Sequence, residues 1–413
     1  MSELSVPTAV RIGSAAGPAG VASPAVPWPT AQSAAARRLG LVLPGGGARG
    51  AYQVGVLKAI AELLPRDAPS PFRVISGTSA GAIIAATLAA HARHFREGAI
   101  SLERFWRNFH IEQVFRSDSA SMLRSGLHWL LALLTGGWLV PPPRSVFDNT
   151  PLRATLERHV NMARVRDALD HGHLDALAIN ASAYRTAWSV AFYECADETP
   201  PWQHTWRQGL PTELGYDHLM ASAAVPFLFP AVRMGDEYYG DGAMRQVAPL
   251  SPAINLGAGR LLVVTVRDSR MRTALPPQSG SGAARGPSFG QLFGFMLDTL
   301  FMDGIQSDLE RLRRDNALIA AAAGPVPEGL RRIEPLVITP REDFGPIAVR
   351  HAGEVPRALR VLLRTMGAAD TAGSTLLSYL LFEAGYTREL IALGYADAKA
   401  RRDELQAFLS SEA

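Results

Sequence analysis

Short apolar runs alternate with helical patterns along the chain from residue 38 onward. The run Leu39–Leu43 has the length of a buried strand and ends at Pro44 and three glycines. Apolar residues then recur at helical spacing from Val56 to Leu64, and a second strand-like run, Phe72–Ile75, precedes a small-residue helix that extends from Ala80 to about Ala92. This order of strands and helices predicts an α/β fold with a mainly parallel sheet.

Later segments continue the same pattern. Four further runs are expected to form strands: Ala176–Asn180, Trp188–Tyr193, Leu261–Val266 and Leu336–Thr339. Pro276–Ser288 is rich in Pro, Gly and Ser and is expected to be a mobile loop, whereas Val355–Ala413 is expected to be mostly helical. Residues 1–38 mix Ala, Pro, Gly and Ser with few large apolar side chains, which predicts a disordered leader without a secretory signal.

Two segments are more apolar than this framework requires. Leu127–Val140 has ten apolar residues in fourteen, and Phe289–Met302 has nine in fourteen. Both are shorter than the ~20 residues of a membrane-spanning helix, and glycines interrupt both. One helical face of the second segment is expected to carry Phe289, Leu292, Phe293, Met296 and Leu300. The alternatives for each segment are a buried core helix and an interfacial or lid element that meets lipid.

The composition narrows the class of protein. Charged residues make up 19% of the chain against a typical ~25%, and 41 basic against 38 acidic residues leave a net charge of only +3. This balance argues against overall disorder and against a nucleic-acid partner bound by phosphate neutralisation. A single cysteine, Cys195, excludes an internal disulfide and a cysteine-based zinc site, which fits a reducing, cytoplasmic location.

The glycines after the first strand formally match a dinucleotide-binding motif. Gly45–Gly50 reads Gly-Gly-Gly-Ala-Arg-Gly, which satisfies G-x-G-x-x-G. A dinucleotide site also needs an acidic residue at the end of the second strand to bind the ribose hydroxyls. The sequence there is Ile75-Ser76-Gly77, so a nucleotide site is disfavoured.

A nucleophilic serine is a better interpretation of the same region. Gly77-Thr78-Ser79-Ala80-Gly81 is a G-x-S-x-G motif between a predicted strand and a predicted helix, where small flanking residues allow a tight turn that exposes Ser79. Backbone N–H groups of Gly45, Gly46 and Gly47 can converge on the oxyanion of an attacked carbonyl, with Arg49 as a fixed cation beside them. The sequence thus offers a nucleophile and an oxyanion hole.

The candidate base is an aspartate. None of the ten histidines lies in a catalytic motif, and His171 and His173 fall in a polar loop that is expected to lie at the surface. Asp241 lies between Gly240 and Gly242, which permit a turn in which the carboxylate approaches another backbone closely. Asp-Gly is also a common plain turn signal, so Asp241 becomes the candidate because the other two motifs accompany it.

Taken together, the motifs resemble those of the patatin-like phospholipases. Gly-Gly-Gly-x-Arg-Gly, G-x-S-x-G and Asp-Gly-Ala occur in that family's order, and Ala221–Pro230 and Pro249–Gly257 resemble its neighbouring blocks. Ser378–Phe382 and Leu393–Ala398 resemble bacterial members. The resemblance implies a three-layer α/β/α fold, a catalytic domain at residues 39–257, and a C-terminal extension at residues 258–413 that packs on it.

The resemblance also implies a lipid acyl hydrolase with a Ser–Asp dyad. Ser79 would be the nucleophile, Asp241 the proton acceptor, and Gly45–Gly47 the oxyanion hole. The supporting motif residues would be Arg49, Gly50, Gly77, Gly81 and Gly242. The substrate would be a phospholipid or another acyl-ester lipid, with peripheral contact to a membrane and with Arg49 near the lipid phosphate. No metal or cofactor is expected. The alternatives are a catalytically silent lipid-binding or partner-regulated protein on the same fold, and a Ser-His-Asp esterase.

Overall fold

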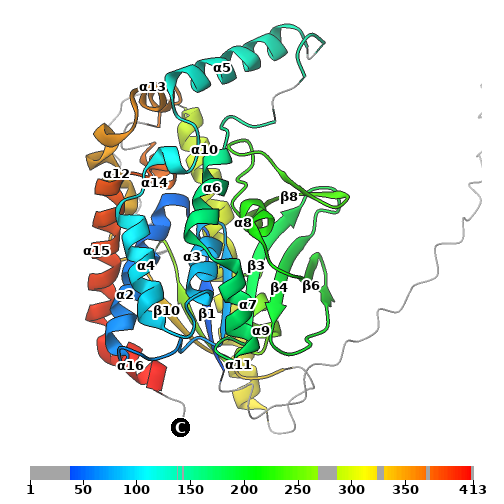
Figure 1. Cartoon of the computed structure of the whole chain (residues 1–413), viewed down its shortest axis with the longest axis vertical. Helices are drawn as coiled ribbons and strands as arrows, with labels where there is room; N and C mark the ends of the chain where they lie inside the picture. The colour runs from blue at the N-terminus through cyan, green and yellow to red at the C-terminus, as the bar shows by residue number, and fades with distance from the viewer. Residues whose placement is uncertain are drawn as a thin grey trace, which may run out of the picture.

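The computed structural model describes residues 38–136, 138–141, 144–267, 286–322, 330–368 and 373–410 (Figure 1). The strands are β1 (Leu39–Leu43), β2 (Val74–Thr78), β3 (Ala176–Ala183), β4 (Ser189–Cys195), β5 (Trp202–His204), β6 (Arg207–Pro211), β7 (Val232–Met234), β8 (Glu237–Asp241), β9 (Arg260–Val264) and β10 (Glu334–Ile338).

The helices in the first part of the chain are α2 (Gly50–Leu63), α3 (Ala80–Ala89), α4 (Phe95–Arg107), α5 (Ser119–Leu134), α6 (Thr150–His159), α7 (Met162–Asp170), α8 (Tyr216–Ser222) and α9 (Ser251–Asn255). Those in the last part are α10 (Phe289–Asp298), α11 (Gly304–Ala321), α12 (Phe344–Arg350), α13 (Arg357–Thr365), α14 (Ser374–Leu380), α15 (Ala384–Ala400) and α16 (Arg402–Ser410). Short turns are η1 (Gly47–Arg49), η2 (Ile111–Gln113), η3 (Gly242–Met244), the π-helical η5 (Thr299–Asp303) and η6 (Ala352–Glu354).

The described strands form one mainly parallel sheet in the order β10-β9-β1-β2-β3-β4-β6-β5, and β8 pairs with both β3 and β7. The run from β10 to β3 is parallel throughout. Antiparallel pairing enters where β3 meets β4 and β8. The sequence pattern did not predict β5 to β8, because these strands have only three to five residues and are partly exposed.

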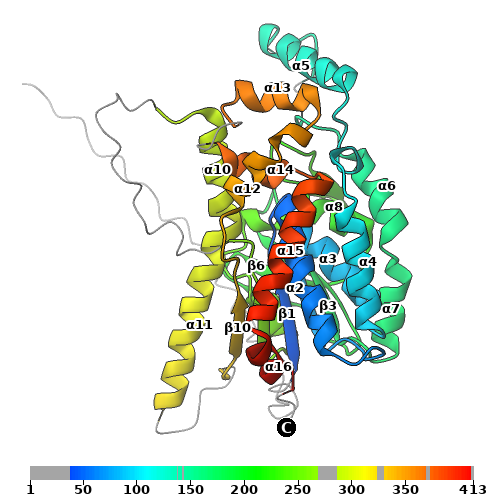
Figure 2. The same ribbon diagram turned by 90° about the vertical axis from the view of Figure 1, so that its left-hand side faces the viewer.

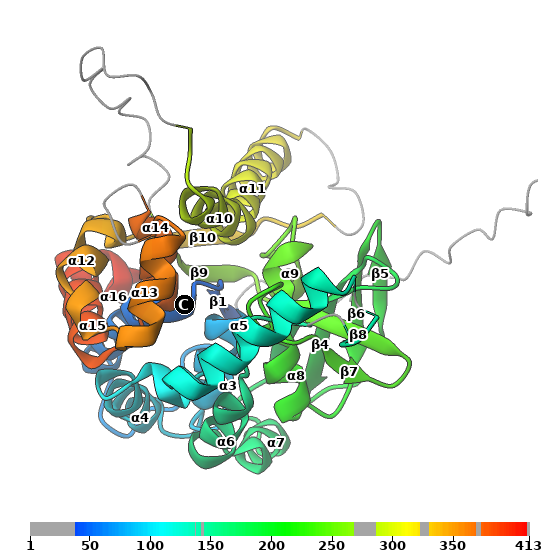
Figure 3. The ribbon, with the colours of Figure 1, turned by 90° about the horizontal axis from the view of Figure 1, so that it is seen from above.

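Alternating side chains of the central strands enter two separate cores. Leu41 and Leu43 of β1 pack with helices α2 and α3, while Val42 packs on the opposite side with residues of α9 and α11. Figure 3 shows α3, α4 and α15 on one side of the sheet and α9 and α11 on the other. Apolar residues on both sides of a strand are the mark of a sheet covered by helices on both faces. The three-layer α/β/α fold is confirmed.

The C-terminal part of the chain is built into the same layers. β9 lies beside β1 within the sheet, and α15 lies along α2 (Figure 2). A side chain at Gly55 would lie 2.0 Å from the carbonyl oxygen of Ile391, and one at Gly394 would lie 2.1 Å from that of Tyr52. The two helices therefore touch backbone to backbone. The expectation that the region from Val355 is mostly helical is confirmed for its described residues.

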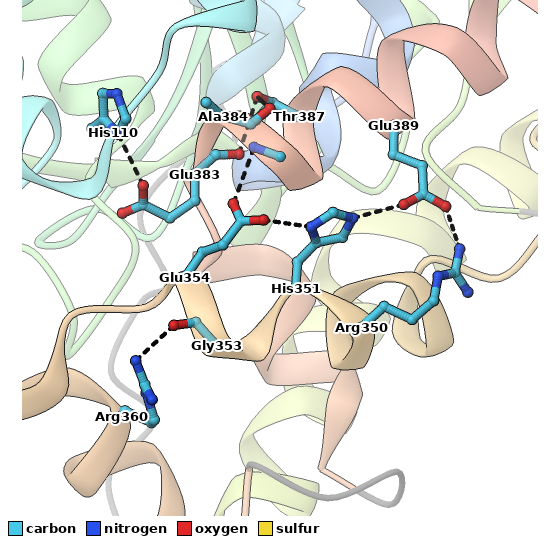
Figure 4. Close-up of polar contacts among 11 residues, drawn as sticks. His110, Arg350, His351, Gly353, Glu354, Arg360, Glu383, Ala384, Thr387 and Glu389 are labelled. Atoms are coloured by element: carbon cyan, nitrogen blue, oxygen red, sulfur yellow. Dashed lines mark hydrogen bonds and ion pairs between the residues drawn. The ribbon is translucent and has the colours of Figure 1, made fainter.

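A charged cluster also joins α12 to α15 (Figure 4). The Nδ1 atom of His351 lies 2.7 Å from a carboxylate oxygen of Glu354, and its Nε2 atom lies 2.7 Å from one of Glu389. Glu354 in turn accepts a 3.0 Å hydrogen bond from the backbone of Gly385 at the start of α15. The imidazole thus bridges two carboxylates on elements that are distant in sequence.

The apolar segment at residues 127–140 is not a buried core helix. Leu127 to Leu134 form the second half of α5, which projects from the upper end of the molecule in Figure 1. Leu133 is 79% exposed, and Trp138 beyond the helix is 86% exposed. The core interpretation of this segment is wrong, because α5 lies beyond the edge of the main apolar core and, among those of its last eight residues whose side chains the structure describes, only Ala132 is buried.

The segment at residues 289–302 forms α10 and the π turn η5, but the expected apolar face is only partly correct. Phe293, Leu297 and Phe301 are buried, at a spacing of four residues, whereas Phe289 and Leu292 are exposed. The buried side is the one that faces α14, where Gly294 lets the two helices approach closely, while Gly290 lies against Met366 and Ala368. The expected leader up to residue 37 and most of the expected loop Pro276–Ser288 lie outside the described residues.

Candidate active site

Ser79 lies at the sharp turn between β2 and α3. Its backbone has φ 55° and ψ −126°, which a non-glycine residue adopts only under strain. A side chain at Gly81 would lie 2.1 Å from the carbonyl oxygen of Leu43, and one at Gly77 would lie 2.5 Å from that of Gly81. The two glycines of the motif are therefore needed because the turn packs directly against β1 and against itself.

Two polar residues that the sequence analysis did not single out hold this turn in place. The backbone N–H of Ser79 donates a 2.8 Å hydrogen bond to the Ser222 hydroxyl, which donates a 2.6 Å bond to the carbonyl oxygen of Asn180. The Asn180 amide donates to the carbonyl oxygen of Gly77 and to the hydroxyl of Thr78. Ser222 lies in the Ala221–Pro230 block, so the resemblance marked its neighbourhood without indicating its role.

Asp241 ends β8 and lies beside Ser79. Pairing between β3 and β8 places it opposite Ala181, and its backbone N–H donates to the carbonyl oxygen of Ala224 at 2.9 Å. The side chain is almost completely buried, and its Oδ1 accepts a 2.9 Å hydrogen bond from the backbone of Ala243. The first two contacts hold the backbone of Asp241, and the bond from Ala243 in η3 holds its carboxylate.

The other oxygen of the Asp241 carboxylate has no complete hydrogen bond. Burial raises the pKa of Asp241 from 3.8 to about 7, while interaction with the Ser79 hydroxyl and the bond from Ala243 act in the opposite direction. Oδ2 is buried, yet no donor among the described residues reaches it with full hydrogen-bond geometry, the Ser79 hydroxyl included. The carboxylate can therefore take up a proton near neutral pH.

The glycine loop after β1 lies against Ser79. A side chain at Gly45 would lie 2.9 Å from Cβ of Ser79. Gly47 has φ +54°, and a side chain there would lie 2.4 Å from the carbonyl oxygen of Tyr379. Within the described part of the chain, the N–H groups of Gly45, Gly46 and Gly47 donate no hydrogen bond. Three unpaired donors therefore lie in a loop beside the Ser79 side chain.

Ser79 opens onto an apolar pocket whose enclosed free volume is about 50 Å³. The pocket walls come from α3, α4, the segment after α8, α10–η5 and α14, and are almost entirely hydrocarbon. Its larger side chains are Ile83, Phe105, Trp106, Phe109, Val114, Leu152, Leu228, Phe229, Leu297, Phe301, Tyr379, Leu380 and Phe382. Walls of this kind favour a hydrocarbon group of a ligand next to the Ser79 hydroxyl.

Arg49 does not face this pocket, contrary to expectation. Its guanidinium is buried, donates to the hydroxyl of Ser378 at 2.7 and 2.9 Å, and pairs with Asp298 at 3.1 Å. It also lies 3.8 Å from the centre of the Tyr379 ring. The prediction that Arg49 contacts a lipid phosphate is therefore wrong, because its guanidinium is buried and its charge is already paired. Arg49 instead attaches the glycine loop to α10 and α14.

The remaining predicted motif residues occupy crowded backbone positions, and no histidine takes a catalytic place. A side chain at Gly242 would lie 2.3 Å from the carbonyl oxygen of Asn180, and one at Gly50 would lie 3.0 Å from the Trp106 ring. None of the described residues that line the pocket is a histidine. His171 is exposed, as expected. Over the described ranges, no three His, Cys, Asp or Glu side chains are placed to hold a metal ion.

The chain is similar to several known proteins. Residues 41–254 match the sequence model of the patatin-like phospholipases. A stretch of 56 residues is 45% identical to lysophospholipase NTE1 of Chaetomium globosum, which corresponds to 14% of this chain and to only 3% of that protein. The structure of VipD from Legionella pneumophila aligns with 86% of this chain and 67% of its own, with a TM-score of 0.30 and 13% identity. Since the family match covers more than half of the 413 residues, the chain belongs to the patatin-like phospholipase family.

Proposed function

We propose that the protein hydrolyses acyl esters of lipids with Ser79 as nucleophile and Asp241 as its base. The observation that carries this proposal is the placement of both residues. Ser79 stands on a strained turn at the wall of an apolar pocket, and a buried carboxylate with an unsatisfied oxygen lies beside it. Strain and an unpaired buried oxygen both cost stability, and their coincidence at one point is typical of a catalytic site.

The chemistry proceeds through an acyl-enzyme. Ser79 Oγ forms a bond to the ester carbonyl carbon while its proton moves to Asp241. When the tetrahedral intermediate collapses, the carbon–oxygen bond to the leaving alcohol breaks and Asp241 returns the proton to that alcohol. A water molecule then gives a proton to Asp241 and attacks the acyl-enzyme, and the departing Ser79 oxygen recovers the proton.

Gly45, Gly46 and Gly47 stabilise the intermediate. Negative charge develops on the carbonyl oxygen, and preorganised N–H donors bind this charge without reorganisation. The three glycine amides suit this role because their N–H groups are otherwise unpaired and because side chains there would collide with Phe301, Val266 and Tyr379. Loss of one such donor typically reduces kcat by ~10²–10³-fold.

The apolar pocket supports a fatty acyl substrate over a polar one. Water is excluded from walls made of aromatic and aliphatic side chains, so a long hydrocarbon chain gains most from binding there. A phospholipid or another acyl-ester lipid fulfils this requirement. The proposal includes no metal or cofactor, because the nucleophile, base and oxyanion donors complete the reaction.

Three variants test the assignment with a soluble short-chain nitrophenyl ester, phospholipid dispersed in detergent and a fluorophosphonate probe. Ser79→Ala is expected to lose probe labelling and turnover, and Asp241→Asn is expected to lose turnover. Asp67→Asn, an exposed aspartate after α2, is the matched control. Full turnover by folded Ser79→Ala and Asp241→Asn would exclude the dyad. Loss of activity only on substitution of a histidine would favour a Ser-His-Asp esterase, and lipid binding without probe labelling would favour a silent lipid-binding protein.

A further inference from the structure

Exposed apolar side chains gather at the end of the molecule that carries α5, α10 and α13. Figures 1 and 2 place these three helices together at the upper end, and in Figure 3 α5 lies across it. The large exposed apolar side chains there are Leu127, Leu131, Leu133, Leu134, Trp138, Leu139, Phe227, Phe289, Leu292, Phe295 and Val361. We call this set the apical surface. Concentration of large apolar groups at one end marks an interaction site, since scattered single residues are the norm elsewhere.

The apical surface is continuous with the pocket in two places. Phe227 is 66% exposed, while Val225 and Leu228 on either side of it line the pocket. In α10 the exposed side chains Phe289, Leu292 and Phe295 give way to Leu297 and, in η5, to Phe301 of the pocket wall. An acyl chain that leaves a bilayer at this surface would therefore pass along hydrocarbon to Ser79.

The α5 side of the apical surface is fixed to the same loop. The backbone N–H groups of Val146 and Phe147 donate hydrogen bonds of 2.8 and 2.9 Å to the carbonyl oxygens of Phe227 and Leu228. The chain that returns from α5 is thereby tied to the pocket loop. Within α5, Leu127, Leu131 and Leu134 follow one another at intervals of four and three residues, so they share one helical face.

Arginines are the charged residues within the segments that carry the apical surface, and the exposed acidic residues Asp118, Asp148 and Glu354 lie at the ends of these segments. Residues 119–147, 286–297 and 355–368 contain five arginines and no Asp or Glu. Arg124, Arg144, Arg357 and Arg364 are exposed. The whole chain has a net charge of only +3, so this positive excess is local. Apolar side chains bordered by arginines, with a highly exposed tryptophan, are the features of a surface that enters the headgroup region of an anionic membrane.

We propose that the apical surface docks on an anionic lipid bilayer and delivers acyl chains from it into the pocket. The delivery of acyl chains to Ser79 rests on the proposed function, whereas docking on the bilayer depends on the apical surface alone. The α5 helix and Trp138 would lie in the plane of the interface, because the apolar stretch is too short to cross it. Among the described residues no helix has the length and apolar character of a membrane span.

Binding is tested with full-length Ser79→Ala protein, so that lipid is not consumed. Vesicles of phosphatidylcholine with phosphatidylglycerol are compared with vesicles of phosphatidylcholine alone by cosedimentation. In this background Leu131→Glu/Leu134→Glu is expected to weaken binding at least tenfold, because two carboxylates would have to enter an apolar layer. Leu318→Glu is the matched control, because Leu318 is a similarly exposed leucine on α11, away from the apical surface.

The charge contribution is tested separately. Arg124→Gln/Arg144→Gln is expected to weaken binding to the anionic vesicles about fivefold per arginine and to leave binding to neutral vesicles unchanged. Arg313→Gln on α11 is the control and is expected to bind as the parent does. Equal binding of the parent to both kinds of vesicle would overturn the anionic part of the proposal.

Turnover separates failure of docking from failure of the catalytic assignment. With Ser79 restored, the α5 double variant is expected to keep its rate on the soluble ester and to lose at least tenfold in hydrolysis of vesicle phospholipid. If the parent binds vesicles but hydrolyses neither substrate, the proposed function fails and the docking surface stands. Unchanged vesicle binding by the double variant would overturn the docking surface. So would a lipid-independent dimer that the variant converts to monomer, or a variant with raised activity on the soluble ester, because these outcomes make α5 a subunit contact or a lid.

Discussion

The raised pKa of Asp241 predicts a steep acid limb in the pH profile. Burial holds the pKa of this carboxyl at about 7 instead of 3.8, and only its ionised form can accept the Ser79 proton. The test therefore varies the pH, and the Asp241→Asn variant removes the group that titrates. Asparagine retains an oxygen that can accept the bond from the Ala243 backbone, so the turn is expected to persist.

The magnitude follows from the fraction of Asp241 that is ionised. With a pKa near 7, about 90% of the carboxyl is ionised at pH 8 and ~1% at pH 5, so kcat/KM falls about 100-fold between them. An aspartate with its ordinary pKa of 3.8 would be ionised at both values and would give a nearly flat profile. The slope should be close to one decade per pH unit below pH 6.

The same group sets a stability trend of defined sign. Between pH 4 and 7 the folded state holds a proton on Asp241 that the unfolded chain has lost, so the free energy of unfolding falls as the pH rises through this window. At 1.36 kcal/mol per pH unit, the contribution reaches ~4 kcal/mol at neutral pH. Asp241→Asn has no buried charge at this position and so avoids this fall in the free energy of unfolding. The variant is expected to be inactive yet more stable than the parent at pH 8.

The assay is the initial rate of acid release from a soluble short-chain ester, measured by chromatography from pH 5 to 9, beside urea unfolding of both proteins. Asp67→Asn again serves as the control and should reproduce the parent in both measurements. A flat profile over this range, with Asp241→Asn within tenfold of the parent, would refute the assignment of the base. If the acid limb appears as expected but Asp241→Asn is no more stable than the parent, other interactions in the folded protein offset the cost of burying the Asp241 charge.

Three further predictions address the supporting structure. Ser222→Ala leaves the Ser79 N–H unpaired, so kcat should fall about tenfold with little change in KM, and urea unfolding should show a loss of about 2 kcal/mol. Ala223→Leu fills part of the pocket, so the ratio of kcat/KM for long over short acyl esters should fall at least tenfold, whereas enlargement at exposed Ala322 should leave it unchanged. Burial alone would lower the pKa of His351, but Glu354 and Glu389 raise it, so the charged imidazole stabilises the fold. His351→Gln should therefore lower the melting temperature by about 2 °C at pH 6. Above the raised pKa the effect should be smaller, because the neutral imidazole of the parent has lost this stabilisation.

The sequence predicted the central strands well because their patterns are local. Leu39–Leu43 and the runs that became β2, β3, β4, β9 and β10 are short, mostly apolar segments, as a sheet covered on both faces requires. The strands β5 to β8 escaped prediction because they have only three to five residues and are partly exposed, so their apolar pattern is weak. The exposure of α5 was missed for another reason: its composition matches that of a core helix, and only the tertiary arrangement leaves Leu133 exposed.

The part of the candidate site that could be predicted is the part where the backbone is so crowded that only glycine fits. A side chain added at Gly45, Gly77 or Gly81 would lie within 3.0 Å of another atom. A glycine at these motif positions therefore shows in the sequence where the backbone is closely packed. Ser222 and Asn180 lack such a signature, because serine and asparagine occur throughout the chain and their hydrogen bonds join β2, β3 and α8. Arg49 was misassigned for the same reason: its acidic partner Asp298 lies 249 positions away.

The position of that partner bears on where the catalytic unit ends. The matched segment stops at residue 254, yet β9 lies beside β1, and the Arg49 charge is paired with Asp298 of α10. Removal of one partner from a buried ion pair typically costs ~3–5 kcal/mol, a large part of the stability of a whole domain. We therefore infer that the boundary at residue 257 marks the limit of the sequence resemblance and that residues 39–257 alone do not fold. Leu297, Phe301 and Tyr379 of the later helices also line the pocket beside Ser79, so we propose that the C-terminal region is part of the active site.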